Sequence, residues 1–376
     1  MINSDWYDLK FLESASNVRN ALKRSMGRSP SVAIANEIAV CIGQGRSFFE
    51  LALSASPQIR PLQLYYGVLS FAMALIAPRT YNSIATISQS HGLSDISAST
   101  SRIDELTVKV LKKGVFQEFS AVVSEMGCIT YYDNSMLSRI HKPFDHPRQV
   151  SGKTITLRQI ITRVPGLDES FERTFNEKAG SFIIDLYNSY GHVELKLWDV
   201  HLFTTKAELI ELIETRRSMF PFLNTWCFSE ANHAWNKSVI SLRNITKPDI
   251  GEFSDQIMIQ AGSSFIIPPE FRTSTVIPFD SIMPPLAGGI TDTHLFAMQP
   301  YDGVLLSEFS LHFMGCFLLS SLVRYRPQIW QRALSHSGSA NVAADDKSLA
   351  LIEQFCDVVI SSFRALVVHS MGLKSV

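Results

Sequence analysis

The sequence predicts a predominantly helical α+β protein, in which two helical parts pack together around an inserted mixed α/β region. Residues 62–77 and 313–323 are apolar nearly all round, as is typical of buried central helices. Between about residues 145 and 300, short β-branched and alternating segments indicate strands. Neither terminal part buries its apolar helix alone, so we expect the two to pack together.

We therefore divide the chain into an N-terminal helical part (1–145), a mixed α/β region (146–300) and a C-terminal helical part (301–376). A hydrophobic content of 46% with 18% charged residues indicates a folded chain and excludes a disordered one. A net charge of −1 provides no overall attraction to nucleic acid or anionic membranes. The 5 cysteines form no CxxC pair, which predicts reduced thiols, a cytoplasmic location and no metal site.

In the N-terminal part, apolar spacing predicts a helix over 32–54, interrupted by Gly43 and Gly45. Two helix-interior glycines indicate that another element packs very close there. A second helix begins near Pro61 and is expected to end at Pro78. It carries a ridge of small or weakly polar residues, where we expect the glycines of the first helix to make contact. The ridge residues are Gln63, Gly67, Ser70 and Ala74.

The remaining elements follow from periodicity and from turn residues. The expected strands are 108–111, a hairpin near 182–200 with a turn at 188–191, then 239–242, 257–259 and 265–267. The expected helices are 115–124, 205–217 with Thr205 as N-cap, 304–323, a short one starting at Pro327, and 348–369. A loop is expected at 338–346. No apolar stretch reaches the ~20 residues that span a bilayer, so no membrane span is expected.

Several motifs are spread over about residues 32–332. They are Gly43-Gln44-Gly45-Arg46-Ser47-Phe48-Phe49, Ile59-Arg60-Pro61-Leu62, Tyr65-Tyr66-Gly67, His91-Gly92-Leu93, Leu157-Arg158-Gln159-Ile160, Arg163-Val164-Pro165, and Leu319-Ser320-Ser321-Leu322-Val323-Arg324-Tyr325-Arg326-Pro327 with Trp330. Together they resemble the bacterial YaaC-like family. The resemblance implies a soluble bacterial protein and transfers no catalytic residue.

The Tyr65-Tyr66 pair on an apolar helix, followed by His91-Gly92, also resembles helical HEPN domains. Many HEPN domains are ribonucleases of toxin and phage-defence systems, with an Arg and a His separated by four to six residues. This chain departs from that pattern, because only three residues separate Arg332 from His336. The resemblance implies an RNA-binding or RNA-cleaving effector as an alternative function.

Arginines and one histidine in these motifs are candidates for binding an anion or nucleic acid: Arg46, Arg60, His91, Arg324 and Arg326. If the two helical parts pack together, the arginines are able to converge on a phosphate or carboxylate. The alternative is that each pairs with an acid such as Glu50 or Glu308, or caps a helix C-terminus. Aromatic residues beside them are candidates for stacking on a base, or else for core packing: Tyr65, Tyr66, Tyr325 and Trp330.

The hairpin offers a second, weaker set. Asp185 on one strand and Glu194 and Lys196 on the next match the residue types of metal-dependent nucleases. Glu194 and Lys196 share one strand face, and the alternative is that this face is simply solvated.

No phosphate-binding, dinucleotide-binding or hydrolase motif occurs in the sequence, so no cofactor is expected. We expect a non-catalytic, partner-binding helical protein, a subunit or sensor in a bacterial stress or antiphage defence system. Its partner would be another protein or a second copy, with RNA as the alternative. The arrangement of the arginines distinguishes the two hypotheses. Convergence of the arginines and His91 in one open pocket favours the RNA effector, and separate ion pairs favour the partner-binding protein.

Overall fold

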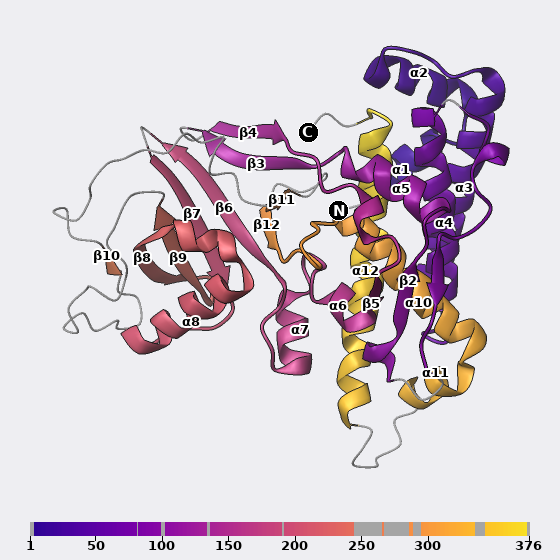
Figure 1. Cartoon of the computed structure of the whole chain (residues 1–376). Coiled ribbons are helices and arrows are strands. Elements are labelled where there is room, and N and C mark those ends of the chain that lie inside the picture. Colours follow the sequence, from indigo (N-terminus) through magenta and orange to yellow (C-terminus); the bar gives the residue numbers. More distant parts are fainter. Residues whose placement is uncertain are drawn as a thin grey trace. The chain divides into compact units, whose positions relative to one another are not determined.

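The chain folds into two units that alternate along the sequence. A computed structural model describes residues 4–80, 82–98, 102–133, 136–189, 192–243, 265–266, 286–288, 295–334 and 343–373 (Figure 1). The first unit comprises Met1–Met126, Pro143–Glu177 and Leu306–Val376, and the second comprises Gly127–Lys142 and Lys178–Leu305. The predicted predominantly helical α+β class is confirmed. Residues 146–177, which the sequence analysis assigned to the mixed region, lie in the first unit.

The first unit is mainly helical and carries a small antiparallel sheet in the order β1-β2-β5. Its strands are β1 (Leu93–Asp95), β2 (Thr107–Val110) and β5 (Thr154–Thr156). Its α-helices are α1 (Ser4–Phe11), α2 (Ala15–Met26), α3 (Val32–Ser54), α4 (Arg60–Thr80), α5 (Val115–Ser124), α6 (Leu157–Ile161), α7 (Asp168–Phe175), α10 (Glu308–Tyr325), α11 (Pro327–Leu334) and α12 (Ala343–Ser370).

The two terminal helical parts pack together, as expected. The buried Tyr65 ring of α4 contacts Phe313 and Phe317 of α10, at centroid separations of 5.9 and 5.8 Å. Phe49 of α3 contacts Phe363 of α12 at 6.4 Å. The core of this unit therefore consists of aromatic edge contacts between helices that are distant in sequence.

Helix ends follow local chemistry, with one correction to the sequence analysis. The Ser31 hydroxyl accepts a hydrogen bond from the Ile34 N–H and caps α3. Pro78 does not end α4, which continues to Thr80. The ring of proline fixes a helical φ, and the lost N–H affects one hydrogen bond, so a final turn still forms.

The C-terminal elements also differ from expectation at their ends. Helix α10 begins at Glu308, where the expected start was 304, because Ser307 caps it by accepting from the Ser310 N–H. The predicted helix start at Pro327 is confirmed. Helix α12 begins at Ala343, inside the loop expected at 338–346, and residues 338–342 lie outside the described part of the chain.

The second unit contains a sheet in the order β10-β8-β9-β7-β6-β12-β11-β3-β4, with helix α8 (Lys206–Met219). Its strands are β3 (Cys128–Asp133), β4 (Met136–His141), β6 (Ser181–Ser189), β7 (His192–Asp199), β8 (Cys227–Ala234), β9 (Lys237–Arg243), β10 (Phe265–Ile266), β11 (Leu286–Gly288) and β12 (Leu295–Met298). The β6–β7 pair confirms the predicted hairpin, and the strand expected at 257–259 lies outside the described residues.

Helix α8 packs on one face of this sheet (Figure 1). Leu209, Leu212 and Ile213 of α8 join a buried cluster with inward residues of β6 and β7, such as Leu186 and Leu195. Thr205 caps α8 as predicted, since its hydroxyl accepts from the Glu208 N–H. The cap fixes where α8 starts, and therefore which of its side chains face the preceding loop.

Among the described helices, α4 alone is long and apolar enough to cross a membrane, and 67% of its most apolar stretch is buried inside the protein. A buried core helix passes the same length and composition test, so this is weak evidence for a span.

Candidate functional site

The arginines singled out in the sequence do not converge on one point. Arg46 donates from Nε to Glu13 and from Nη1 to Glu50, the latter at 2.5 Å. Arg60 forms an ion pair with Asp357 of α12. These contacts join α3 to the segment that follows α1, and α4 to α12. Each guanidinium is held by its own carboxylates.

Arg326 has a separate partner at the end of α10. Its Nη1 lies 2.5 Å from Asp95 Oδ2, and its Nη2 donates to the Ser97 carbonyl at 3.0 Å. Burial alone would raise the pKa of Asp95, but hydrogen bonds from Arg326, Ser321 and Ser97 outweigh it and lower that pKa. The ion pair fastens the end of β1 to the α10–α11 junction.

Arg324 and His91 belong to a different cluster, built on Tyr65. The Tyr65 hydroxyl lies 2.8 Å from His91 Nδ1, and the His91 ring lies 5.8 Å from the Phe317 ring of α10. The Arg324 side chain folds back along α10, because its Nε donates to the Ser320 carbonyl at 3.3 Å. This direction brings the guanidinium toward the level of Phe317, where His91 sits.

The electrostatics of this cluster agree with that geometry. Burial lowers the pKa of His91, and the positive charge of Arg324 lowers it further. Burial raises the pKa of Tyr65 far above its ordinary value, so the phenol remains protonated. The cluster thus offers a neutral imidazole beside a guanidinium.

Arg324 differs from the other three arginines in its partners. Within the described residues it forms no ion pair, and its guanidinium carbon lies 5.0 Å from the Tyr325 ring centroid. Tyr325 is 70% exposed. A guanidinium stacked on an exposed aromatic ring is suited to an anion or a base.

The predicted nuclease residues lie together on the half-exposed face of the β6–β7 hairpin. Asp185 and Lys196 are direct cross-strand partners. Asp185 accepts a hydrogen bond from Trp198 Nε1 at 2.8 Å, and Lys196 Nζ lies 4.7 Å from the Tyr187 ring centroid. Asp185 and Glu194 belong to no group of metal-ligating side chains in the described part of the chain.

The spacing of Arg332 and His336, which was compared with that of HEPN domains, extends into a part of the chain that the structure does not describe. The side chain of Arg332 and the whole of His336 lie outside the described residues.

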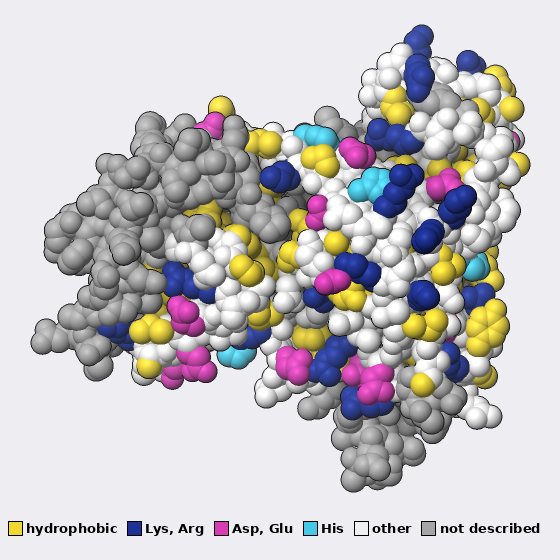
Figure 2. Space-filling model, viewed as in Figure 1, with side chains coloured by type: hydrophobic (Ala, Val, Ile, Leu, Met, Phe, Trp, Pro, Cys, Tyr) yellow, Lys and Arg dark blue, Asp and Glu magenta, His cyan; other side chains and the backbone are white. Residues whose placement is uncertain are grey.

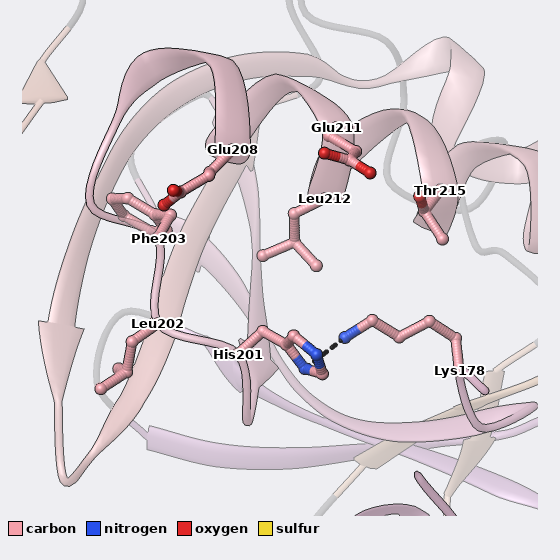
Figure 3. A pocket seen from close by; sticks show the side chains of 8 residues that line it. All are labelled: Lys178, His201, Leu202, Phe203, Glu208, Glu211, Leu212 and Thr215. Carbon is pink, nitrogen blue, oxygen red and sulfur yellow. Dashed lines mark hydrogen bonds between the residues drawn. The ribbon is translucent and has the colours of Figure 1, made fainter. Parts of the chain in front are cut away.

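A pocket that the sequence analysis missed lies in the second unit, between α8 and the segment that follows β7 (Figure 3). Its volume is about 380 Å³. Lys178 and His201 form one wall, and Glu208 and Glu211 project from α8 on the other. The sequence analysis predicted one feature of this pocket, the Thr205 cap. The cap sets the start of α8 and so places Glu208 and Glu211 in its first turns.

A buried ion pair anchors the Lys178 wall. Asp199 is 2% exposed and lies 3.0 Å from Lys178 Nζ and 2.6 Å from Arg216 Nη2. Burial would raise the pKa of Asp199, but the charges of Arg216 and Lys178 outweigh it and lower that pKa. The backbone N–H of His201 also donates to Asp199, at 2.9 Å. These bonds fix the segment that carries His201.

The fold defines a two-unit α+β protein, in which Arg46, Arg60 and Arg326 are held in separate ion pairs. The sequence matches the family described as YaaC-like Protein over residues 10–371, and the chain belongs to that family. No curated protein and no solved structure matches the chain.

Proposed function

We propose that this protein is a non-catalytic, partner-binding protein that docks another protein on the outer face of α3. It would act as the subunit or sensor expected from the sequence for a bacterial stress or antiphage defence system, in the cytoplasm. The observation that carries this proposal is the composition of that face. It is long, exposed and almost free of charge.

The outer face of α3 consists of exposed residues at helical spacing, Val32, Asn36, Val40, Gln44, Ser47, Leu51 and Ser54. Val32, Val40 and Leu51 are 62%, 52% and 51% exposed. These residues carry no charge, and the exposed charged residue beside them, Glu50, already forms an ion pair with Arg46. A solvated helix face ordinarily carries several charges, so this one is unusual.

This composition matches the centre of a protein–protein interface. Interface cores are depleted of charged residues, whereas bulk hydrophobicity distinguishes them little from other surfaces. A helix of this length presents about 34 Å of surface. We therefore expect a partner with a complementary apolar, weakly charged surface, which would cover Val40 and Leu51.

The charge distribution supports the same proposal. Arg46, Arg60 and Arg326 are each neutralised by a carboxylate, so they do not form a cationic site. Basic and acidic side chains are interspersed over the face that Figure 2 shows. Nonspecific nucleic-acid binding relies on a one-signed basic surface.

The test is a mass-spectrometric pull-down of the tagged protein from its native cells, with and without ribonuclease. A Val40→Glu/Leu51→Glu variant should lose a stoichiometric protein partner that survives ribonuclease. The matched control is Met136→Glu/Leu137→Glu, which charges another exposed apolar pair (72% and 48% exposed) and should retain the partner. Equal melting temperatures show that both variants fold.

Absence of a stoichiometric partner from the wild-type pull-down, or equal loss in both variants, would contradict the proposal. If the partner is a second copy of this chain, the claim that a different protein docks on α3 is wrong. Size-exclusion chromatography with light scattering detects such self-association.

A second candidate function is RNA binding at Arg324, favoured by its stacking on exposed Tyr325 and its lack of an ion pair in the described structure. Stacking on an aromatic ring beside a guanidinium is a common mode of single-strand recognition. Recovered RNA that is lost in Arg324→Ala but retained in Arg46→Ala would support it. No enriched RNA in the wild-type pull-down would exclude it.

A further inference from the structure

The pocket of the second unit has one wall with basic side chains and one with acidic side chains (Figure 3). Lys178 and His201 lie on one side, and Glu208 and Glu211 of α8 lie across from them. The volume of about 380 Å³ falls within the range of small-molecule sites. Every lining residue belongs to the same unit.

The basic wall presents an oriented hydrogen-bond donor. Lys178 Nζ lies 2.7 Å from His201 Nδ1 (Figure 3). An ammonium group only donates, so Nδ1 must accept, and the imidazole proton is assigned to Nε2. The His201 side chain is 62% exposed, which leaves its ring accessible to a ligand in the pocket. Asp199 holds both Lys178 and the His201 backbone in place.

The acidic wall is also positioned by local structure. Glu208 and Glu211 are three residues apart on α8, and therefore lie one turn apart on the same face. Glu208 Oε2 accepts hydrogen bonds from the Thr204 N–H at 2.6 Å and from the Thr204 hydroxyl at 2.9 Å. These bonds lower the pKa of Glu208, so its carboxylate stays ionised.

Apolar side chains complete the lining. Leu202 and Phe203 follow His201 in the chain, and Leu212 points from α8 into the space between the walls (Figure 3). Apolar surface next to a few fixed polar groups is the usual composition of a small-ligand site.

We propose that this pocket binds a small zwitterion of the α-amino acid class that carries an apolar side chain. The ammonium group of the ligand would lie at Glu211 and Glu208, its carboxylate at His201 Nε2, and its side chain against Leu212 and Phe203. A ligand with only one charge engages one wall and makes no polar contact with the other. A zwitterion satisfies both walls at once, which distinguishes this class from simple amines and simple acids.

The inference does not rest on the proposed docking function, because it concerns a different unit and different residues. Isothermal titration calorimetry of the full chain tests it with free leucine, methionine and phenylalanine as probes. Two analogues of leucine complete the set, 3-methylbutylamine without the carboxylate and 4-methylpentanoate without the amino group. We expect one of the amino acids to bind, and each single-charge analogue of leucine to bind at least about tenfold more weakly than leucine.

Variants assign the binding to this pocket. Glu211→Gln should weaken amino-acid binding about tenfold or more, and His201→Phe should do the same by removing the donor to the carboxylate. The matched control is Glu214→Gln, the same substitution on α8 outside the pocket lining, which should leave the affinity unchanged. Unchanged melting temperatures exclude misfolding as the cause.

Three results would overturn the proposal. They are no heat of binding for any amino acid at millimolar concentration, 3-methylbutylamine binding as tightly as leucine, and equal affinity of Glu211→Gln and wild type. The pull-down with the α3 variants does not depend on these binding measurements. A failure of the amino-acid proposal can therefore be distinguished from a failure of the proposed docking function.

Discussion

The carbonyl oxygen of Gly45 on α3 lies 3.3 Å from the position that a Cβ atom on Gly67 of α4 would occupy. Each glycine also faces a phenylalanine ring of the opposite helix. A Cβ on Gly45 would meet the Phe71 ring at 2.6 Å, and one on Gly67 would meet the Phe49 ring at 2.3 Å. The helices therefore meet backbone to backbone, and the two rings pack in an edge contact of 5.0 Å between centroids.

This contact predicts a specific cost for a side chain at position 45. Gly45→Leu must displace the Phe71 ring from a closely packed core, so we expect destabilisation of at least about 1–3 kcal/mol. Urea unfolding followed by circular dichroism measures it.

The matched control for that substitution lies on the same helix, two residues away. A Cβ on Gly43 would meet Glu13 at 3.4 Å, which is an ordinary contact. Gly43→Ala should be neutral or stabilising, because alanine favours a helix by about 1 kcal/mol over glycine. Equal effects of the two substitutions would contradict the close approach of α3 and α4.

The glycine contact shows what the sequence was able to predict. Local periodicity located α3 and α4, and Gly45 indicated the close contact between them, because both signals lie within a few turns of chain. Gly43, which was expected in the same contact, faces Glu13 instead. The partners of the arginines carry no such signal. Arg60 and Asp357 are 297 residues apart, and only the packing of α4 on α12 brings them together.

The pocket was missed for a similar reason. Lys178 precedes β6, His201 follows β7, and Glu211 lies on α8, so no single segment displays the site. The position of Lys178 opposite α8 depends on Asp199, a residue that appears in the sequence as an ordinary strand end. Such a site requires the three-dimensional fold.

A second prediction concerns His312, which is fully buried on α10. Neither of its ring nitrogens has a hydrogen-bond partner in the described structure, and its ring lies among Phe309, Phe355 and Phe363. Burial lowers the pKa of His312 from 6.5 to about 3. The unfolded chain therefore binds a proton between these values and the folded protein does not.

Protonation of His312 in the unfolded chain has little effect on the free energy of unfolding above about pH 6.5, and lowers it progressively as the pH falls from 6.5 toward 3. We expect wild type to lose about 2 kcal/mol from this group between about pH 7.5 and pH 5. His312→Leu should remove that loss, and should also stabilise the protein at pH 7.5, because two unpaired buried nitrogens disappear. Urea titrations at both pH values measure the two effects. Parallel pH dependence in variant and wild type would be the contrary result.

A third prediction concerns the Asp199–Arg216 ion pair, in which both residues are 2% exposed. Asp199→Ala leaves the Arg216 guanidinium buried without its carboxylate, so we expect a cost of about 3–5 kcal/mol. The lowered pKa of Asp199 gives a matching pH dependence: its stabilisation is present above the ordinary value of 3.8 and is lost as the pH falls through the folded value.

A double-mutant cycle separates this charge effect from lost packing. Asp199→Ala combined with Arg216→Met should cost less than the sum of the single substitutions, because no isolated charge remains. Denaturant unfolding at pH 7 measures each corner of the cycle. Strict additivity would show that the pair contributes through packing alone.

The last prediction concerns the protonation of His91 beside Arg324. The positive guanidinium disfavours the imidazolium, so it contributes to the lowered pKa of His91 in addition to burial. Arg324→Gln removes the charge and keeps a polar side chain, and should therefore raise the pKa of His91. Arg324→Lys keeps a positive charge at the same position and is expected to change that pKa less. Titration of the His91 ring signals by NMR measures both variants. An identical His91 pKa in wild type and Arg324→Gln would place the guanidinium too far away to act with His91, and would also weaken the case for an anion at this cluster.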